Sequence, residues 1–293
     1  MLNILNIVLP TFIVIIIGYI LGKITRWDMS AVVDVIFYVG MPALAFTSMT
    51  GRQIILSDAA KIWASALIIM AGTGLAAWVV FKVSKQKHSG LFVAIIIMNA
   101  VNIPFPVMSL AYGQAGLFAA TLFYIPVTLL SFTVGVMILS KTNWRDGIKE
   151  TLKVPAIYGA VIGLAINLLH VSIPQLVSNP LSLIGSMVTP LLLLTLGYRL
   201  SSVRITSFPI TALASGIRIG VGLLIGVGVA AMLGLAGISR SVVILDSAMP
   251  SAANTSILAM KYNNEAELVS SVVFVTTVAS LLIIPLLLFL LGH

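Results

Sequence analysis

The chain has 293 residues, of which 60% are hydrophobic and 8% are charged, and its formal net charge is +8. A composition this apolar excludes a soluble globular domain and predicts an integral membrane protein. The basic residues lie between apolar segments rather than in one tail, which argues against a nucleic-acid partner, and the absence of cysteine excludes disulfides, thiolate metal sites and cysteine catalysis.

Ten apolar segments have the length expected of transmembrane helices, about 20 residues each. Helices are the expected spanning elements, because these segments are too long and too uniformly apolar for barrel strands. In chain order, spans 1 to 10 are predicted at 2–22, 31–49, 61–81, 90–112, 116–139, 153–171, 178–200, 207–235, 241–261 and 267–291.

The basic residues predict how the chain is oriented. If the ten spans alternate in direction, 12 of the 16 lysines and arginines fall on one side, 3 fall on the other and Arg218 lies within span 8. Lysine and arginine are enriched in cytoplasmic loops, so both termini are expected to lie outside the cytoplasm, in the plasma membrane (the inner membrane of a bacterium). The basic segment 141–152 is predicted to be a short cytoplasmic linker between two halves, 1–140 and 153–293.

Span 4 contains the sequence NAVNIPFP, with Asn99, Asn102, Pro104 and Pro106 close together near its middle. A proline inside a helix removes a backbone hydrogen bond and clashes with the preceding turn. A helix broken within a membrane is tolerated only where its free backbone groups lie within protein or line a cavity. We therefore predict a broken helix and a binding site here, although a lone proline would more often be structural.

Span 9 contains a second break, in LDSAMPSAANTS, where Asn254 and Thr255 follow Pro250. The segment MSLAYGQAGLFAATLF (108–123) also resembles LAMKYNNEAELVSSVVF (258–274) in the other half. Because each half has five spans, an odd number, the second half must lie upside-down relative to the first. Inverted repeats with interrupted helices at matching positions point to the binding site of a secondary transporter.

Two charged residues are predicted to lie within the membrane. Arg218 near the centre of span 8 is either a counter-charge for an anionic substrate or the partner of Asp246 in an ion pair. Asp246 lies one helical turn before Pro250, where it could carry a proton, bind sodium together with free carbonyl groups, or pair with Arg218. No other metal site is expected.

At the broken spans the sequence resembles the auxin efflux carrier family, which includes plant auxin exporters and bacterial organic-acid permeases such as malate and malonate permeases. Span 4 of the plant carriers has an asparagine seven residues before a proline and ends in Tyr-Gly, as Asn99, Pro106, Tyr112 and Gly113 do here. Span 9 of the family has Ala-x-Pro and ends in Tyr-Asn, which is similar to AMPSAANTSILAMKYN at 248–263.

Other segments extend this resemblance along the chain. LKVPAIYGAVIGLAINLL (152–169) is similar to the sixth span of the family, and GIRIGVG (216–222) is similar to the eighth, with Arg218 at the family's arginine. Asp58 and Lys61 stand where the plant carriers have an Asp–Lys pair, at a spacing of three rather than four. The long central loop of many plant members is absent.

The resemblance implies an all-α fold of ten transmembrane helices in two inverted five-helix repeats, like sodium/proton antiporters and bile-acid symporters. Spans 4 and 9 would cross mid-membrane at their breaks. Spans 1, 2, 6 and 7 would form a scaffold and a homodimer interface, and spans 3–5 and 8–10 would move as an elevator. Asn99 and Arg218 are the candidate substrate-binding residues that the resemblance carries over.

We predict a secondary transporter that moves an organic anion, an auxin-like or small mono- or dicarboxylate, by alternating access and without a cofactor. An anion receptor without transport, or a sodium- or proton-coupled exchanger of another substrate, is the alternative. An intramembrane enzyme is disfavoured, because the sequence has no Ser/His pair, no paired intramembrane aspartates and no His-Glu-x-x-His motif. The expected partners are the substrate, the lipid bilayer and a second copy of the chain.

Overall fold

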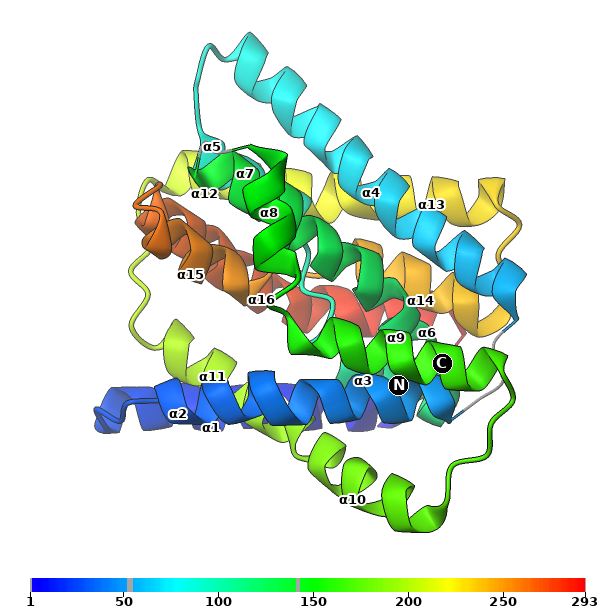
Figure 1. Cartoon of the computed structure of the whole chain (residues 1–293). Helices are drawn as coiled ribbons and strands as arrows, with labels where there is room; N and C mark the ends of the chain where they lie inside the picture. Colours follow the sequence, from blue (N-terminus) through cyan, green and yellow to red (C-terminus); the bar gives the residue numbers. More distant parts are fainter. Residues whose placement is uncertain (1, 52–54, 141–142, 293) are drawn as a thin grey trace.

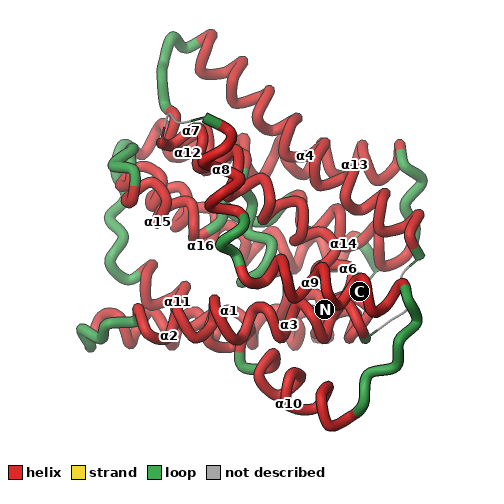
Figure 2. Tube along the Cα trace, viewed as in Figure 1, coloured by secondary structure: helices red, strands yellow, loops and turns green. Residues whose placement is uncertain are grey.

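A computed structural model describes residues 2–51, 55–140 and 143–292, and every regular element in these ranges is helical (Figures 1 and 2). Residues 141–142 of the predicted linker, the end residues 1 and 293 of the predicted halves, and Arg52 lie outside these ranges. The described elements of the first half are α1 (Leu2–Ile24), α2 (Ser30–Val35), η1 (Ile36–Gly40), α3 (Met41–Thr50), α4 (Leu56–Val83), α5 (Ser89–Ile96), α6 (Pro104–Leu130), η2 (Ser131–Gly135) and α7 (Val136–Ser140).

The described elements of the second half are also all helices. Its elements are α8 (Trp144–Thr151), α9 (Pro155–Leu168), α10 (Gln175–Ser186), α11 (Val188–Leu200), α12 (Phe208–Gly216), η3 (Ile217–Val221), α13 (Gly222–Met232), α14 (Gly237–Ser247), α15 (Ala253–Lys261) and α16 (Ala266–Leu290). The elements η1, η2 and η3 are π-helical turns within longer helices.

Within the described residues, seven helical stretches are long and apolar enough to cross a membrane. The bent pair α8 and α9, whose axes differ by 70°, would make eight if it were counted as one span. The predicted all-α, multi-pass membrane fold is therefore confirmed, whereas the prediction of ten spans is not established by this criterion.

The difference between the seven candidate spans of the structure and the ten predicted from the sequence has a structural cause. Predicted spans 4 and 9 are each broken near the middle, so neither is one uninterrupted helix over its predicted range. The second piece of span 4 also runs on into span 5 as the single helical stretch Pro104–Ser140. Gly113 interrupts this stretch with φ 60° and ψ −149°, a conformation that is essentially restricted to glycine.

The helices pack in two groups that meet around the broken segments. In the first group α1 packs on α11, and α3 packs on α9 and α10, as the lower part of Figure 1 shows for α1, α10 and α11. In the second group α4 packs on α6 and α13, α14 packs on α6 and α13, and α16 packs on α12 and α15. Contacts of α1 with α6 and α16, and of α3 with α6, join the two groups.

Candidate functional site

The two helix breaks expected from the prolines are present, and they lie side by side. α5 ends at Ile96 and α6 begins at Pro104, while α14 ends at Ser247 and α15 begins at Ala253. The extended segments between these helices form an antiparallel bridge at Met98 and Ser251. Such pairing satisfies backbone groups that a membrane interior would otherwise leave without partners.

Two backbone hydrogen bonds hold this bridge. The amide of Asn99 donates to the carbonyl oxygen of Pro250 at 2.7 Å, and the amide of Ala252 donates to the carbonyl oxygen of Ile97 at 3.0 Å. Pro250 therefore marks the break and supplies an acceptor to the opposite segment.

The buried side chain of Asn99 organises the turn that leads into α6. Its Oδ1 atom accepts hydrogen bonds from the amides of Val101 at 3.3 Å and Asn102 at 2.9 Å. Because two N–H groups point at this atom, it must be the oxygen, and the amide nitrogen Nδ2 faces the other way. Nδ2 is buried and has no hydrogen-bond partner, so it is a donor available to a ligand.

Pro104 and Pro106 lie in the first turn of α6 and are buried. Proline suits this position, because its fixed φ is helical and its missing N–H group would have no partner within the helix. The structure thus gives both prolines a role in starting the helix, and neither lines the cavity described next.

A cavity of about 290 Å³, named here the central cavity, lies where the broken segments face the first group of helices. Asn99, Asn102 and Asn254 line it together with the first residues of α15. The first turn of a helix has free N–H groups and partial positive charge, which favour an anion. The wider walls come from η1, α3, α6, η2 and α11, and include Phe37, Met41, Tyr124, Val127, Phe132, Leu192 and Leu196.

A second cavity of about 670 Å³, named here the entrance cavity, adjoins the central cavity. Leu196, Arg199, Ala253 and Ile257 line both cavities. The entrance cavity extends to Arg204 in the loop before α12 and to Glu267 at the start of α16. Arg199 therefore lies where the two cavities meet.

Sequence reasoning did not select Arg199 as a site residue. It is half-buried near the end of α11, and in the described part of the chain its guanidinium group has no hydrogen bond or ion pair. The available signal was its position inside predicted span 178–200, one residue before the end of that span.

Arg218 is fully buried, but it does not line the central cavity. Its Nη1 atom donates to the carbonyl oxygens of Ile95 at 2.9 Å and Ile96 at 3.4 Å, and its Nη2 atom donates to the carbonyl oxygen of Ser247 at 2.6 Å. These carbonyls belong to the C-terminal ends of α5 and α14, where helices carry partial negative charge. Arg218 thus joins the ends of both broken helices.

Small residues on α13 allow this arrangement. A Cβ atom at Gly222 would lie 2.5 Å from the carbonyl oxygen of Ser247, and Gly226 likewise faces the side chain of Ser247. A larger residue at Gly222 would therefore push α14 away from Arg218. Close packing of small residues is a common basis of helix contact in membranes.

Asp246 is also fully buried, one residue before the end of α14, and neither of its carboxylate oxygens has a hydrogen-bond partner. No ion pair between Asp246 and Arg218 is present among the described residues, so this structure does not contain the predicted pair. An isolated ionised carboxylate is very costly to bury. Asp246 therefore requires a proton or a bound cation. No cluster of three or more His, Cys, Asp or Glu residues that could hold a metal ion occurs in the described ranges.

The remaining predicted residues lie outside the central cavity. The hydroxyl group of Thr255 donates to the carbonyl oxygen of Ala252 at 2.6 Å, within the first turn of α15. Asp58 lies exposed in the first turn of α4, where a negative charge is favourable, and Lys61 lies one turn further on. The structure does not bring Asp58 or Lys61 to the helix breaks.

Comparisons with known proteins identify the class of this chain. Residues 144–288 match the family model described as membrane transport protein. An uncharacterized transporter of Methanothermobacter thermautotrophicus is 29% identical over 290 residues, which cover 95% of each chain. An uncharacterized transporter of Methanocaldococcus jannaschii is 24% identical over 303 residues, which cover 96% of this chain and 97% of the relative.

These matches agree with the all-α membrane fold, and they are to transporters rather than to enzymes. Over residues 144–288 the chain matches the membrane transport protein family, which is the family of the auxin efflux carriers. The resemblance found in the sequence is thereby confirmed at the level of the family.

Proposed function

We propose that this membrane transporter moves a small organic anion, an auxin-like or small mono- or dicarboxylate, across the plasma membrane by alternating access. The observation that carries the proposal is the set of free donors around the central cavity. Nδ2 of Asn99 has no partner, Arg199 has no described partner, and the first turn of α15 lines the same space without a side-chain cap. Free donors beside a positive helix end favour a carboxylate.

The remaining walls suit the organic part of such a substrate. Phe37, Tyr124 and Phe132 bring aromatic rings to the central cavity, and the ring of Tyr124 is also packed edge-to-face on Phe105. Ligand sites in proteins are commonly apolar with a few placed polar groups. The proposed substrate therefore places its carboxylate on Asn99 and Arg199 and its apolar body on these rings.

The packing of the helices supports an elevator mechanism on a ten-helix inverted-repeat fold. The group α1–α3 with α9–α11 corresponds to predicted spans 1, 2, 6 and 7, and we assign it the scaffold and homodimer interface. The group α4–α7 with α12–α16 corresponds to predicted spans 3–5 and 8–10 and carries both breaks. Residues of both groups line the central cavity, so moving one against the other would change its access.

The entrance cavity supports an assignment of the side on which the substrate enters. It extends to the loop that contains Arg204, which the distribution of basic residues predicts to be cytoplasmic. In this proposal the structure is open toward the cytoplasm, and both termini lie on the opposite side.

Asp246 supports proton coupling, because its buried carboxylate has no partner among the described residues. We expect Asp246→Asn to fold normally, since the amide has the same shape without a charge. In proteoliposomes the variant should lose substrate accumulation driven by a pH gradient and retain exchange of labelled for unlabelled substrate. Asp34→Asn, at an exposed aspartate of α2, is the matched control. Accumulation that follows a sodium gradient instead would assign Asp246 to sodium.

Substrate binding at Asn99 is tested by a thermal-shift screen of the purified protein against mono- and dicarboxylates, including indole-3-acetate and malonate. Asn99→Asp keeps an oxygen acceptor for the amides of Val101 and Asn102, but replaces the free donor with a second acceptor. An acid that raises the melting temperature of the wild-type protein should therefore have no effect on this variant.

The screen also separates this function from its alternatives. If no acid stabilises the wild-type protein, the anion assignment is wrong, and amine and cation substrates on the same fold become the next candidates. If an acid binds but does not enter sealed proteoliposomes, the protein is an anion receptor rather than a transporter.

A further inference from the structure

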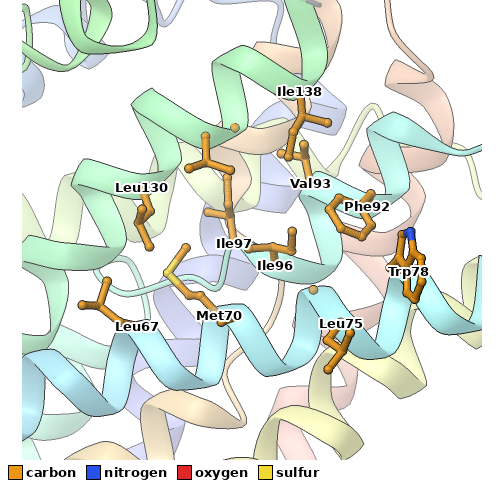
Figure 3. A pocket seen from close by; sticks show the side chains of 14 residues that line it. Leu67, Met70, Leu75, Trp78, Phe92, Val93, Ile96, Ile97, Leu130 and Ile138 are labelled. Atoms are coloured by element: carbon orange, nitrogen blue, oxygen red, sulfur yellow. The ribbon is translucent and has the colours of Figure 1, made fainter. Parts of the chain in front are cut away.

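An apolar groove of about 470 Å³ lies between α4, α5 and the segment formed by the end of α6, η2 and α7 (Figure 3). It is named here the lateral groove. Leu67, Met70, Leu75 and Trp78 of α4 form one side, as Figure 3 shows. Leu75 is 61% exposed and Trp78 is 50% exposed, so the groove is open along α4. Because α4 is a membrane-spanning helix, the neighbour of this opening is the lipid bilayer.

One end of the lateral groove is basic. Lys82 follows Trp78 by one helical turn, and its Nζ atom lies 4.5 Å from the centre of the indole ring. Lys85 and Lys87 follow in the exposed connection to α5. Tryptophan is enriched at the membrane interface, and lysine at that level attracts anionic lipid headgroups.

We propose that the lateral groove binds one acyl chain of an anionic phospholipid, whose headgroup phosphate pairs with Lys82. Leu67 and Trp78 are 11 residues apart, so the groove follows α4 for about 16 Å along the helix axis. The phosphate would lie beside Lys82, and the chain would extend from Trp78 toward Leu67. Apolar walls and a cationic end match the two parts of one lipid molecule.

The lateral groove and the central cavity share one wall. Ile96 and Ile97 line the groove, and the next residues, Met98 and Asn99, line the central cavity. The carbonyl oxygen of Ile97 accepts the hydrogen bond from Ala252 that holds the two broken segments together. A lipid in the groove therefore packs against the back of the segment that presents Asn99 to the substrate.

Native mass spectrometry of the purified full-length protein tests this inference after incubation with phosphatidylglycerol or phosphatidylcholine. We expect the wild-type protein to retain one phosphatidylglycerol per chain, several-fold more than phosphatidylcholine. Ala71→Trp should abolish retention, because Ala71 lines the groove and is exposed, so the ring would fill the groove without disturbing the core. Lys82→Gln should remove the preference for phosphatidylglycerol.

Lys23→Gln is the matched control. Lys23 also lies one turn after an aromatic residue, with its Nζ atom 5.5 Å from the ring of Tyr19, but it is on α1 and away from the groove. Its substitution should leave lipid retention unchanged. Equal retention of both lipids by the wild-type protein, or full retention by Ala71→Trp, would overturn the proposal. If the wild-type protein is a dimer that retains no lipid, and Ala71→Trp is a monomer, the lateral groove is a contact between two copies of the chain instead.

Discussion

Arg218→Met is expected to destabilise the protein strongly. The substitution leaves the carbonyl oxygens of Ile95 and Ser247 buried without a donor, and each buried polar group without a partner costs about 1–3 kcal/mol. We therefore expect a loss on the order of 3 kcal/mol or more, because both helix ends lose their donor at once. The melting temperature of the purified protein in detergent measures this loss.

Two further variants define what Arg218 does. Arg218→Lys should recover part of the stability, because one ammonium group can reach fewer carbonyls than the forked guanidinium group. Arg240→Met, at an exposed arginine on α14, should leave the melting temperature unchanged. If Arg218→Met has wild-type stability but no longer binds the substrate, Arg218 is the substrate's counter-charge and the positioning role is wrong.

The sequence predicts the breaks well because their cause is local. Two prolines close together in span 4 and one in span 9 cannot be accommodated within regular helices. The same reasoning selected Asn99, since an amide within an apolar segment requires partners. The structure adds that the oxygen of Asn99 is used within its own turn, which leaves only the nitrogen for a ligand.

The partners of Arg218 were not predictable in the same way. Its burial follows from its place in span 8, but sequence alone does not say which atoms lie at the same depth. The sequence favours a charged partner, either a substrate or Asp246, whereas the observed partners are backbone carbonyls at two helix ends. Each broken helix creates a C-terminal end whose backbone carbonyls need hydrogen-bond donors, and a buried arginine can supply them.

The π-helical turns carry three residues that bear on the site, of which the sequence selects only Arg218. η1 and η2 contribute Phe37 and Phe132 to the central cavity, and η3 carries Arg218. A π turn inserts an extra residue and rotates the side chains that follow it relative to a regular helix. The 3.6-residue period of a regular helix therefore does not indicate which way Phe37 and Phe132 face.

Arg199→Gln is expected to weaken substrate binding by about 10- to 100-fold, the effect of losing one charge-assisted hydrogen bond. Stability should change little, because the guanidinium group of Arg199 has no described partner in the protein, and substitutions without lost contacts usually stay within about 0.5 kcal/mol. Titration of the purified protein with the acid found in the thermal-shift screen measures the dissociation constant, and the melting temperature without ligand measures stability.

Arg204→Gln is the matched control, because Arg204 lines the entrance cavity but not the central cavity. It should reduce the rate of substrate entry more than the affinity, since a charge along an approach path acts mainly on association. Substitution of the fully buried Arg218 should therefore lower the stability of the protein, whereas substitution of the half-buried Arg199 should lower its affinity for the substrate. If the affinity of Arg199→Gln is unchanged, Arg199 does not bind the substrate. The carboxylate would then have to bind to Asn99 and the first turn of α15 without a cationic side chain.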